Sequence, residues 1–190
     1  FEIFPVIDST NSELMRRIQS GQFPRSGTVV VSESQTAGRG RRGRHWQSPF
    51  GTNLYFSYYW LLDDGLQAAM GVSIAVGLAV YDALKALYKI DVQLKWPNDI
   101  LVQEQKLAGV LVELDGQPEG PCHLVIGIGL NLKMPASASA NIDQAWTDLT
   151  LLGCDVDKNK LVALLTDCLE KRLAQYRQSG LDKMHQQWNQ

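Results

Sequence analysis

The sequence has 190 residues, of which 45% are hydrophobic and 20% are charged, and this is the composition of one ordinary globular domain. Its formal net charge of −2 argues against a general nucleic-acid binder, because such proteins are more often basic overall. Cys122, Cys154 and Cys168 have neither CxxC nor Cys/His spacing, which argues against a disulfide framework or a zinc site. We therefore expect free thiols in a cytoplasmic protein.

The apolar segments of the chain do not predict a membrane protein. No positively charged segment leads into an apolar run near Phe1, so we expect no secretory signal in the sequence as given. The most apolar stretch, residues 68–81, is interrupted by Ser73 and is shorter than the ~20 residues that a membrane span requires. We predict that it belongs to a buried helix.

The first half of the chain is predicted to alternate strands and helices. Strands are expected at 1–7, 28–32 and 53–62, and a long apolar helix at 68–87. Between the first two strands, Thr10 and Glu13 fit the capping box of a helix that ends at Gly21. Two interpretations of Ser9 and Thr10 stay open: they cap this helix, or the helix N-terminus holds a polar ligand group.

The second half of the chain is predicted to form short strands joined by polar turns. Strands are expected at 92–95, 100–102, 106–114 and 123–128, a proline-containing turn at 96–99, a loop at 134–144, and helices at 146–152 and 158–178. Short connections favour antiparallel pairing. Residues 127–131, GIGLN, do not form a dinucleotide-binding turn, because the third glycine is missing and no helix follows. The predicted fold class is α/β (α+β), with a mixed, largely antiparallel sheet flanked by helices.

A glycine- and arginine-rich segment joins two of the predicted strands. Residues 38–44, GRGRRGR, contain four arginines and three glycines, and we call them the arginine loop. Glycine disfavours helix interiors by about 1 kcal/mol relative to alanine and packs nothing in a strand, so the segment is predicted to be irregular. Guanidinium groups offer paired donors to phosphate or carboxylate. The composition therefore indicates a loop that binds an anion.

Two other interpretations of the arginine loop stay open at this point. The segment can be a flexible, solvated loop, or it can grip the phosphates of a nucleic acid. The loop alone does not decide between a small anionic ligand and these alternatives. The remaining motifs of the chain are needed.

Five short motifs, taken in order, resemble those of the biotin protein ligases. They are Ser9-Thr10-Asn11, GRGRRGRHWxSPxGxNLY at 38–55, KWPND at 95–99, KLAGxLxE at 106–113 and GxGxN at 127–131. Each motif is weak alone, but their order and spacing are specific, and the resemblance covers essentially the whole chain. It implies a catalytic domain with a mixed sheet, similar to class II aminoacyl-tRNA synthetases.

The resemblance also implies an activity and its partners. Biotin and ATP would give biotinyl-5′-adenylate and pyrophosphate, and the biotinyl group would pass to one lysine of a biotin carboxyl carrier protein. Relatives commonly have a small C-terminal β-barrel, and some have an N-terminal winged-helix domain that binds DNA. We expect residues 1–190 to be a single catalytic domain with neither addition, and therefore no nucleic-acid partner. A homodimer through a sheet edge is an open expectation.

Individual site residues are carried over from the resemblance by matching positions. Biotin is expected to contact Ser9, Thr10, Asn11, Gln35, Arg39, Lys106, Gly109 and Gly129, and the nucleotide to contact Arg41, Arg42, Arg44, Trp46 and Asn131. Trp46 would stack on adenine, and Arg39, Arg41 and Lys106 would meet the biotin carboxylate and the phosphates. Lys106 is the residue expected to stabilise the transition state, because its ammonium is a compact charge. Without the motif, Lys106 would be an exposed turn lysine and Trp46 a core residue.

The KWPND motif carries the assignments for a metal ion and for the incoming lysine amine. Asn98 and Asp99 are expected to serve Mg²⁺, with Asn98 as the assigned ligand, or to orient the incoming lysine amine, with Asp99 as its base, although a plain Pro-Asn-Asp turn explains both residues. The loop at 134–144 matches in position the segment that orders over the adenylate in relatives.

Two rival functions remain. Lipoate ligases share the fold and the adenylation chemistry, but their usual Arg-Arg-x-Ser-Gly-Gly-Gly string is missing here. A non-catalytic nucleic-acid module would use the segment 39–44 on phosphates, with an affinity that falls steeply as salt rises.

Overall fold

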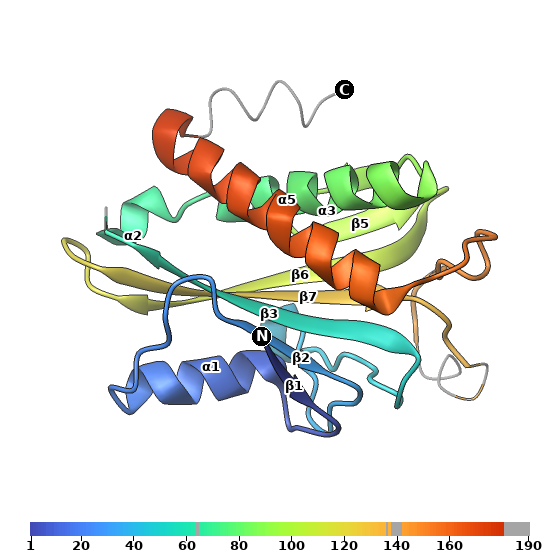
Figure 1. Ribbon diagram of the computed structural model, residues 1–190, viewed down its shortest axis with the longest axis horizontal. Coiled ribbons are helices and arrows are strands. Elements are labelled where there is room, and N and C mark those ends of the chain that lie inside the picture. Colours follow the sequence, from blue (N-terminus) through green and yellow to red (C-terminus); the bar gives the residue numbers. More distant parts are fainter. Residues whose placement is uncertain (64, 136, 138–141, 181–190) are drawn as a thin grey trace.

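The computed structural model describes residues 1–63, 65–135, 137 and 142–180. Its strands are β1 (Glu2–Phe4), β2 (Val29–Ser32), β3 (Asn53–Leu62), β4 (Gln93–Lys95), β5 (Asp99–Val102), β6 (Gln105–Gly116) and β7 (Cys122–Asn131). Its helices are α1 (Thr10–Gln19), the 3₁₀ turn η1 (Arg41–Gly43), α2 (Gly65–Ala68), α3 (Val72–Tyr88) and α5 (Lys158–Ser179). Figure 1 shows these elements as two unequal helical layers on either side of one sheet.

The sheet has seven strands in the order β1-β2-β3-β7-β6-β5-β4. Among these named strands only β1 and β2 pair in parallel, and the other neighbours are antiparallel. The longest ladders join β7 to β3 and to β6, so β7 lies at the centre of the sheet. The predicted mixed, largely antiparallel sheet flanked by helices is confirmed.

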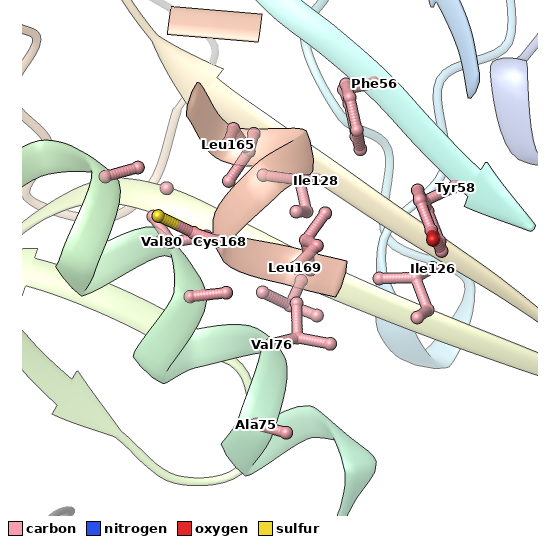
Figure 2. Close-up of a cluster of buried hydrophobic side chains, with 14 of the residues drawn as sticks. Phe56, Tyr58, Ala75, Val76, Val80, Ile126, Ile128, Leu165, Cys168 and Leu169 are labelled. Atoms are coloured by element: carbon pink, nitrogen blue, oxygen red, sulfur yellow. The ribbon is translucent and has the colours of Figure 1, made fainter. Parts of the chain in front are cut away.

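One face of the sheet carries the main hydrophobic core. Helices α3 and α5 pack on this face, and Figure 2 shows side chains from both helices meeting the strand residues Phe56, Tyr58, Ile126 and Ile128. Leu169 of α5 is fully buried among them. Burial of large apolar side chains is worth roughly 1.5–3 kcal/mol each, so this layer supplies most of the stability of the fold.

The opposite face is only partly covered. Helix α1 packs Leu14 and Ile18 against Val30, Tyr59 and Val125, and it lies on the side of the sheet away from α3 and α5 (Figure 1). Because α1 is only ten residues long, the remaining part of this face is left for a ligand site.

The central strand β7 explains the GIGLN sequence. Ile126, Ile128 and Leu130 point into the core, whereas Gly127 and Gly129 alternate with them and face the α1 side. The segment is therefore a strand through Asn131, and our prediction that it ends at Ile128 was too short. The rejection of a dinucleotide-binding turn is consistent with this strand.

The structure corrects several other expectations. Residues 146–152 do not form a helix: Trp146 bridges to Lys106, and the Asp148 carboxylate accepts the backbone N–H of Leu151 at 2.7 Å, which stabilises a turn. The first strand is limited to β1, and the helix predicted at 68–87 begins only at Val72, because Gly71 adopts a left-handed conformation with φ of +91°. Of the predicted loop at 134–144, residues 136 and 138–141 lie outside the described residues.

The span Gly65–Tyr88 contains both α2 and α3, and its length and composition alone would suit a membrane span, whereas we expected an apolar stretch of only residues 68–81. Its residues Ala75, Val76, Ala79 and Val80 are buried in the core against the sheet and α5. The apolar composition is accounted for by this packing, as in the core helix of a globular domain.

Truncation of the α5 core residue tests this packing. Leu169→Ala should lower the free energy of unfolding by about 2–5 kcal/mol, because it removes buried methyl groups and leaves a cavity. Leu151→Ala is the matched control, since Leu151 is 68% exposed, and it should change the free energy by less than about 0.5 kcal/mol. Urea denaturation followed by circular dichroism measures both, and equal effects would contradict the assigned core.

Candidate active site

A cavity of about 910 Å³ opens on the face of the sheet that α1 leaves uncovered. Every residue that the sequence assigned to a ligand lines it: Ser9, Thr10, Asn11, Gln35, Arg39, Arg41, Arg42, Arg44, Trp46, Asn98, Asp99, Lys106, Gly109, Gly129 and Asn131. These residues come from the start of α1, the arginine loop and the strands β5 to β7. The fold thus gathers the separate motifs at one place, while the role of each residue stays a prediction.

The floor of the cavity is made of backbone. Gly109 on β6 and Gly129 on β7 are paired neighbours in the sheet, and Gly127 lies two residues before Gly129 on the same face. A Cβ on Gly127 would lie 2.9 Å from Cγ of Asn11, and one on Gly129 would lie 2.6 Å from Cζ2 of Trp46. A side chain at Gly127 or Gly129 would therefore displace Asn11 or Trp46, which form the walls of the cavity.

The first turn of α1 forms one wall. Ser9 is the N-cap and its Oγ accepts the Ser12 N–H at 3.4 Å, so the predicted Thr10–Glu13 capping box is wrong. The Glu13 carboxylate instead accepts hydrogen bonds from Arg16 and Arg17. The Thr10 side chain does not cap the helix, because Ser9 is the N-cap residue.

Thr10 is held by polar contacts across the chain. Its backbone N–H donates to Oε1 of Gln35 at 2.9 Å, and the Ser57 hydroxyl lies 2.7 Å from the Thr10 hydroxyl. Gln35 in turn donates from Nε2 to the hydroxyl of Ser48 at 3.1 Å. These bonds fix the predicted biotin-contacting residues Thr10 and Gln35 relative to each other.

The arginine loop is irregular apart from the 3₁₀ turn η1, as its composition predicted. The Arg42 backbone is left-handed with φ of +57°, and the following Gly43, which adopts such a conformation without steric cost, has φ of +72°. Arg41, Arg42 and Arg44 are exposed, and within the part of the chain that the structure describes they form no ion pair. Their positive charges are therefore available to an anion at the cavity.

Arg39 differs from the other arginines of the loop. Its guanidinium is bound by both carboxylate oxygens of Glu113, at 2.9 and 2.8 Å. This bidentate contact crosses from the loop to β6 and uses one donor on each terminal nitrogen of Arg39, so the remaining guanidinium N–H groups are left for a ligand.

Trp46 lies over the glycine floor. Besides its contact with Gly129, its Cζ3 would lie 3.0 Å from a Cβ on Gly109, and the Lys106 ammonium lies 5.4 Å from the ring centroid. Its indole Nε1 is buried without a hydrogen-bond acceptor among the described residues. A buried, unsatisfied donor costs about 1–3 kcal/mol, so this atom is suited to an acceptor on a ligand.

Lys106 and Asp99 form the charged centre of the site. Lys106 Nζ lies 2.7 Å from Asp99 Oδ1, and the two side chains are only 12% and 25% exposed. Oδ1 is buried and makes no well-aligned hydrogen bond, so the contact is an ion pair. Lys106 is thus held in the cavity and is not the solvated turn lysine of the alternative interpretation.

Asn131 closes the far end of the floor. Its Nδ2 donates to the carbonyls of Lys106 and Thr147, at 3.3 and 3.0 Å. It therefore ties β7 to the start of β6 and to the chain around Trp146, as well as lining the cavity.

The KWPND segment offers one amide oxygen and one carboxylate, from Asn98 and Asp99, as candidate metal ligands. The described residues contain no group of three or more His, Cys, Asp or Glu side chains that could coordinate a metal. Asn98 and Asp99 both line the cavity, and Asp99 is also ion-paired with Lys106. Mg²⁺ often uses one or two carboxylates together with substrate phosphates, so these residues fit an ion that arrives with a nucleotide.

Sequence reasoning left out several residues of the site. Glu113 and Gly127 were present in the quoted motifs but were not assigned, and their spacing on β6 and β7 was the available signal. Ser57 had no signal, because only the fold brings it to Thr10 and Asn11. Tyr55 also lines the cavity. Its hydroxyl donates a hydrogen bond to the Pro49 carbonyl at 2.8 Å. Burial raises the pKa of this phenol, so Tyr55 stays neutral.

Comparison with known proteins matches this arrangement to a family. Residues 3–131 match the model of the biotin/lipoate A/B protein ligase family. The chain belongs to that family. The match includes the arginine loop, the KWPND segment and the glycine strand, so the family sequence pattern and the cavity coincide.

Relatives of this biotin/lipoate ligase family member have been named and some have been solved. The chain is 42% identical over 186 residues to the "Bifunctional ligase/repressor BirA" of Escherichia coli K12, which covers 98% of this chain and 57% of that protein. It is 38% identical over 177 residues to the "Biotin--[acetyl-CoA-carboxylase] ligase" of Mycobacterium tuberculosis, covering 90% of this chain and 63% of that one. The chain therefore spans less than two thirds of the length of both relatives.

The fold is also similar to a solved ligase. The biotin protein ligase from Aquifex aeolicus in complex with biotin and ATP aligns with a TM-score of 0.78 at 29% identity, covering 98% of this chain and 75% of that one. The resemblance in fold to biotin protein ligases is therefore confirmed.

The contact between the Trp46 indole and the glycine floor predicts that substitutions at Trp46 and Gly129 have coupled effects on the free energy of unfolding. Gly129→Ala should destabilise the protein by about 1–3 kcal/mol, because the new methyl group displaces the indole. In a Trp46→Ala background, Gly129→Ala should lower the free energy of unfolding by less than about 0.5 kcal/mol, because the indole that the new methyl group would meet has been removed.

Gly120→Ala is the control for this pair, since a Cβ there meets nothing within 4 Å. Denaturant unfolding of the single and double variants gives the coupling. Additive losses for Gly129→Ala and Trp46→Ala would show that the indole does not rest on the floor.

Proposed function

We propose that this chain is the catalytic domain of a biotin protein ligase. It would activate biotin with ATP and transfer the biotinyl group to one lysine of a biotin carboxyl carrier protein. The observation that carries the proposal is the single cavity in which the arginine loop, Lys106 and the glycine floor meet. The names of the relatives and the biotin and ATP in the Aquifex aeolicus complex support the choice of substrates.

In the first step, a carboxylate oxygen of biotin attacks the α-phosphorus of ATP. The bond from this phosphorus to the bridging oxygen breaks, and pyrophosphate leaves with the electron pair. The protein's part is to hold the two reactants in line and to stabilise the charge that develops on the phosphate oxygens. Lys106 and the exposed arginines Arg41, Arg42 and Arg44 supply that positive charge.

Asp99 keeps Lys106 in place during this step. Its carboxylate holds the ammonium at 2.7 Å inside the cavity, so the charge is oriented before the substrates arrive. In the second step a lysine amine of the carrier attacks the acyl carbon of biotinyl-5′-adenylate, AMP leaves, and the amine loses a proton. Asp99 lines the cavity beside Lys106 and is the proposed acceptor of that proton.

Mg²⁺ bound with the ATP phosphates would neutralise part of their charge, and Asn98 and Asp99 are the residues proposed to face it. Trp46 is proposed to stack on adenine and Asn131 to lie near the nucleotide. Ser9, Thr10, Asn11 and Gln35 are proposed at the biotin ring, where the donors and acceptors of α1 meet Gln35.

We also propose a cellular setting and two protein partners. The free cysteines suit a reducing cytoplasm. The sheet ends at β1 and β4, whose outer backbone groups offer an edge for pairing with a second copy. The carrier protein is proposed from the carboxylase named in the relatives.

Pyrophosphate exchange into ATP tests the proposal. The chain is incubated in parallel with biotin, lipoate or neither acid, and labelled pyrophosphate is followed into ATP. Exchange with biotin alone is the expected result. Exchange with lipoate alone would replace biotin by the lipoate alternative, and tight, salt-sensitive DNA or RNA binding without either exchange would favour the nucleic-acid module.

Removal of the Lys106 charge should separate catalysis from binding. Lys106→Ala is expected to lower the rate of biotin adenylation by about 100-fold or more, while the dissociation constant of biotin changes by less than about threefold. Rapid-quench kinetics and calorimetry measure the two quantities. Lys133→Ala is the control, because Lys133 is an exposed lysine outside the cavity. Equal losses in rate and affinity would contradict the transition-state role.

A further inference from the structure

Glu113 has contacts that no ligand assignment uses. It lies on β6, on the same face as Gly109 and Leu111, and it is not among the residues that line the cavity. Its carboxylate is nevertheless fully occupied: Oε1 accepts from Arg39, and Oε2 accepts from both Arg39 and Asn11. One side chain thus connects β6, the arginine loop and the first turn of α1.

Asn11, at one end of this network, is buried, and both ends of its side-chain amide are hydrogen-bonded. Asn11 donates from Nδ2 to Oε2 of Glu113 at 2.9 Å and to the Leu111 carbonyl at 3.3 Å. Its Oδ1 accepts from the Ser57 hydroxyl at 2.5 Å, and Asn11 and Ser57 are 3% and 0% exposed. Asn11 is therefore engaged by protein groups, and its amide orientation is set by Glu113 and Ser57.

The Arg39 side of the network reaches the base of the arginine loop. Arg39 pairs with His45 through a β-bridge, and the Trp46 N–H donates to the Gly38 carbonyl at 2.9 Å. The loop is therefore closed at its base next to Arg39, and the exposed arginines and Trp46 extend from that base. A bidentate guanidinium–carboxylate contact fixes orientation as well as distance. Glu113 is thus placed to fix the direction in which the loop leaves the sheet.

We propose that Glu113 is a positioning residue: through Arg39 it holds the arginine loop over the cavity, and through Asn11 it holds the α1 wall. The effect on substrate binding rests on the proposed function, whereas the effect on the loop does not. Arg39 is then an anchor of the loop in addition to any contact with the ligand. The opposing interpretation is that the pair is a surface ion pair with little influence, because Arg39 is 43% exposed.

The rate of trypsin cleavage measures how firmly the arginine loop is held, and it does not require the protein to be an active enzyme. Arg41, Arg42 and Arg44 are exposed cleavage sites, and cleavage requires the loop to leave its folded position. Glu113→Gln should raise the rate of cleavage at these arginines by about threefold or more, with mass spectrometry identifying the sites. Arg39→Gln removes the same ion pair from the loop side and should raise the rate similarly.

Asp115→Asn is the matched control, because Asp115 lies two residues further along the same face of β6 and loses the same charge. It should leave loop cleavage unchanged. In the Arg39→Gln background, Glu113→Gln should add little further cleavage, because its partner is already gone. Unchanged cleavage in Glu113→Gln, or an equal increase in Asp115→Asn, would overturn the proposal.

Kinetics of biotin-dependent pyrophosphate exchange give the second readout. Glu113→Gln should raise the KM for biotin by about fivefold and also lower kcat, because the loop that it releases carries the arginines assigned to the phosphates, while the melting temperature changes little. A general loss of folding would instead lower kcat and the melting temperature together. If Glu113→Gln does not fold, Arg39→Gln decides the question by loop cleavage. A wild-type chain without exchange would contradict the proposed function, and the cleavage result would still decide the role of Glu113.

Discussion

The site depends on a strip of exposed backbone at the centre of the sheet. Gly109, Gly127 and Gly129 face the α1 side, while the residues between them on β7 are large aliphatics that enter the core. The same two strands therefore stabilise the fold on one face and leave space on the other. Any side chain at Gly127 or Gly129 would meet Asn11 or Trp46, so the walls and the floor are matched to each other.

The second constraint concerns the cationic side chains of the site, some of which form ion pairs with carboxylates whereas others are exposed. The protein has a formal net charge of −2, yet it places a cluster of arginines beside one cavity. Two of the site's cations have internal carboxylate partners, Lys106 with Asp99 and Arg39 with Glu113, and they are held in fixed positions. The exposed arginines of η1 and its end are available to a ligand. This division suits an enzyme that must hold one anion precisely and attract another.

Much of this could be predicted from the sequence. Periodicity and turn residues located nearly all of the strands and both long helices, because each is locally consistent with its burial. Motif order placed every assigned residue at the cavity. Local rules failed where tertiary contacts decide: residues 146–152 look helical but bridge to Lys106, and the carboxylate of Glu13, expected in a capping box, is taken by Arg16 and Arg17. The links from Ser57 to Asn11 and from Glu113 to Arg39 join residues far apart in the chain, so no local pattern could reveal them.

The central claim is that biotin binds on the glycine floor beneath the arginine loop. Titration of an isotope-labelled sample with biotin, followed by backbone amide NMR, tests this most directly. The account predicts saturable shifts at Gly109, Gly127 and Gly129 and at the Trp46 indole, with Gly120 and Gly153 unchanged because they lie outside the cavity lining. Saturable shifts confined to other parts of the chain, or no response to biotin at millimolar concentration, would contradict it.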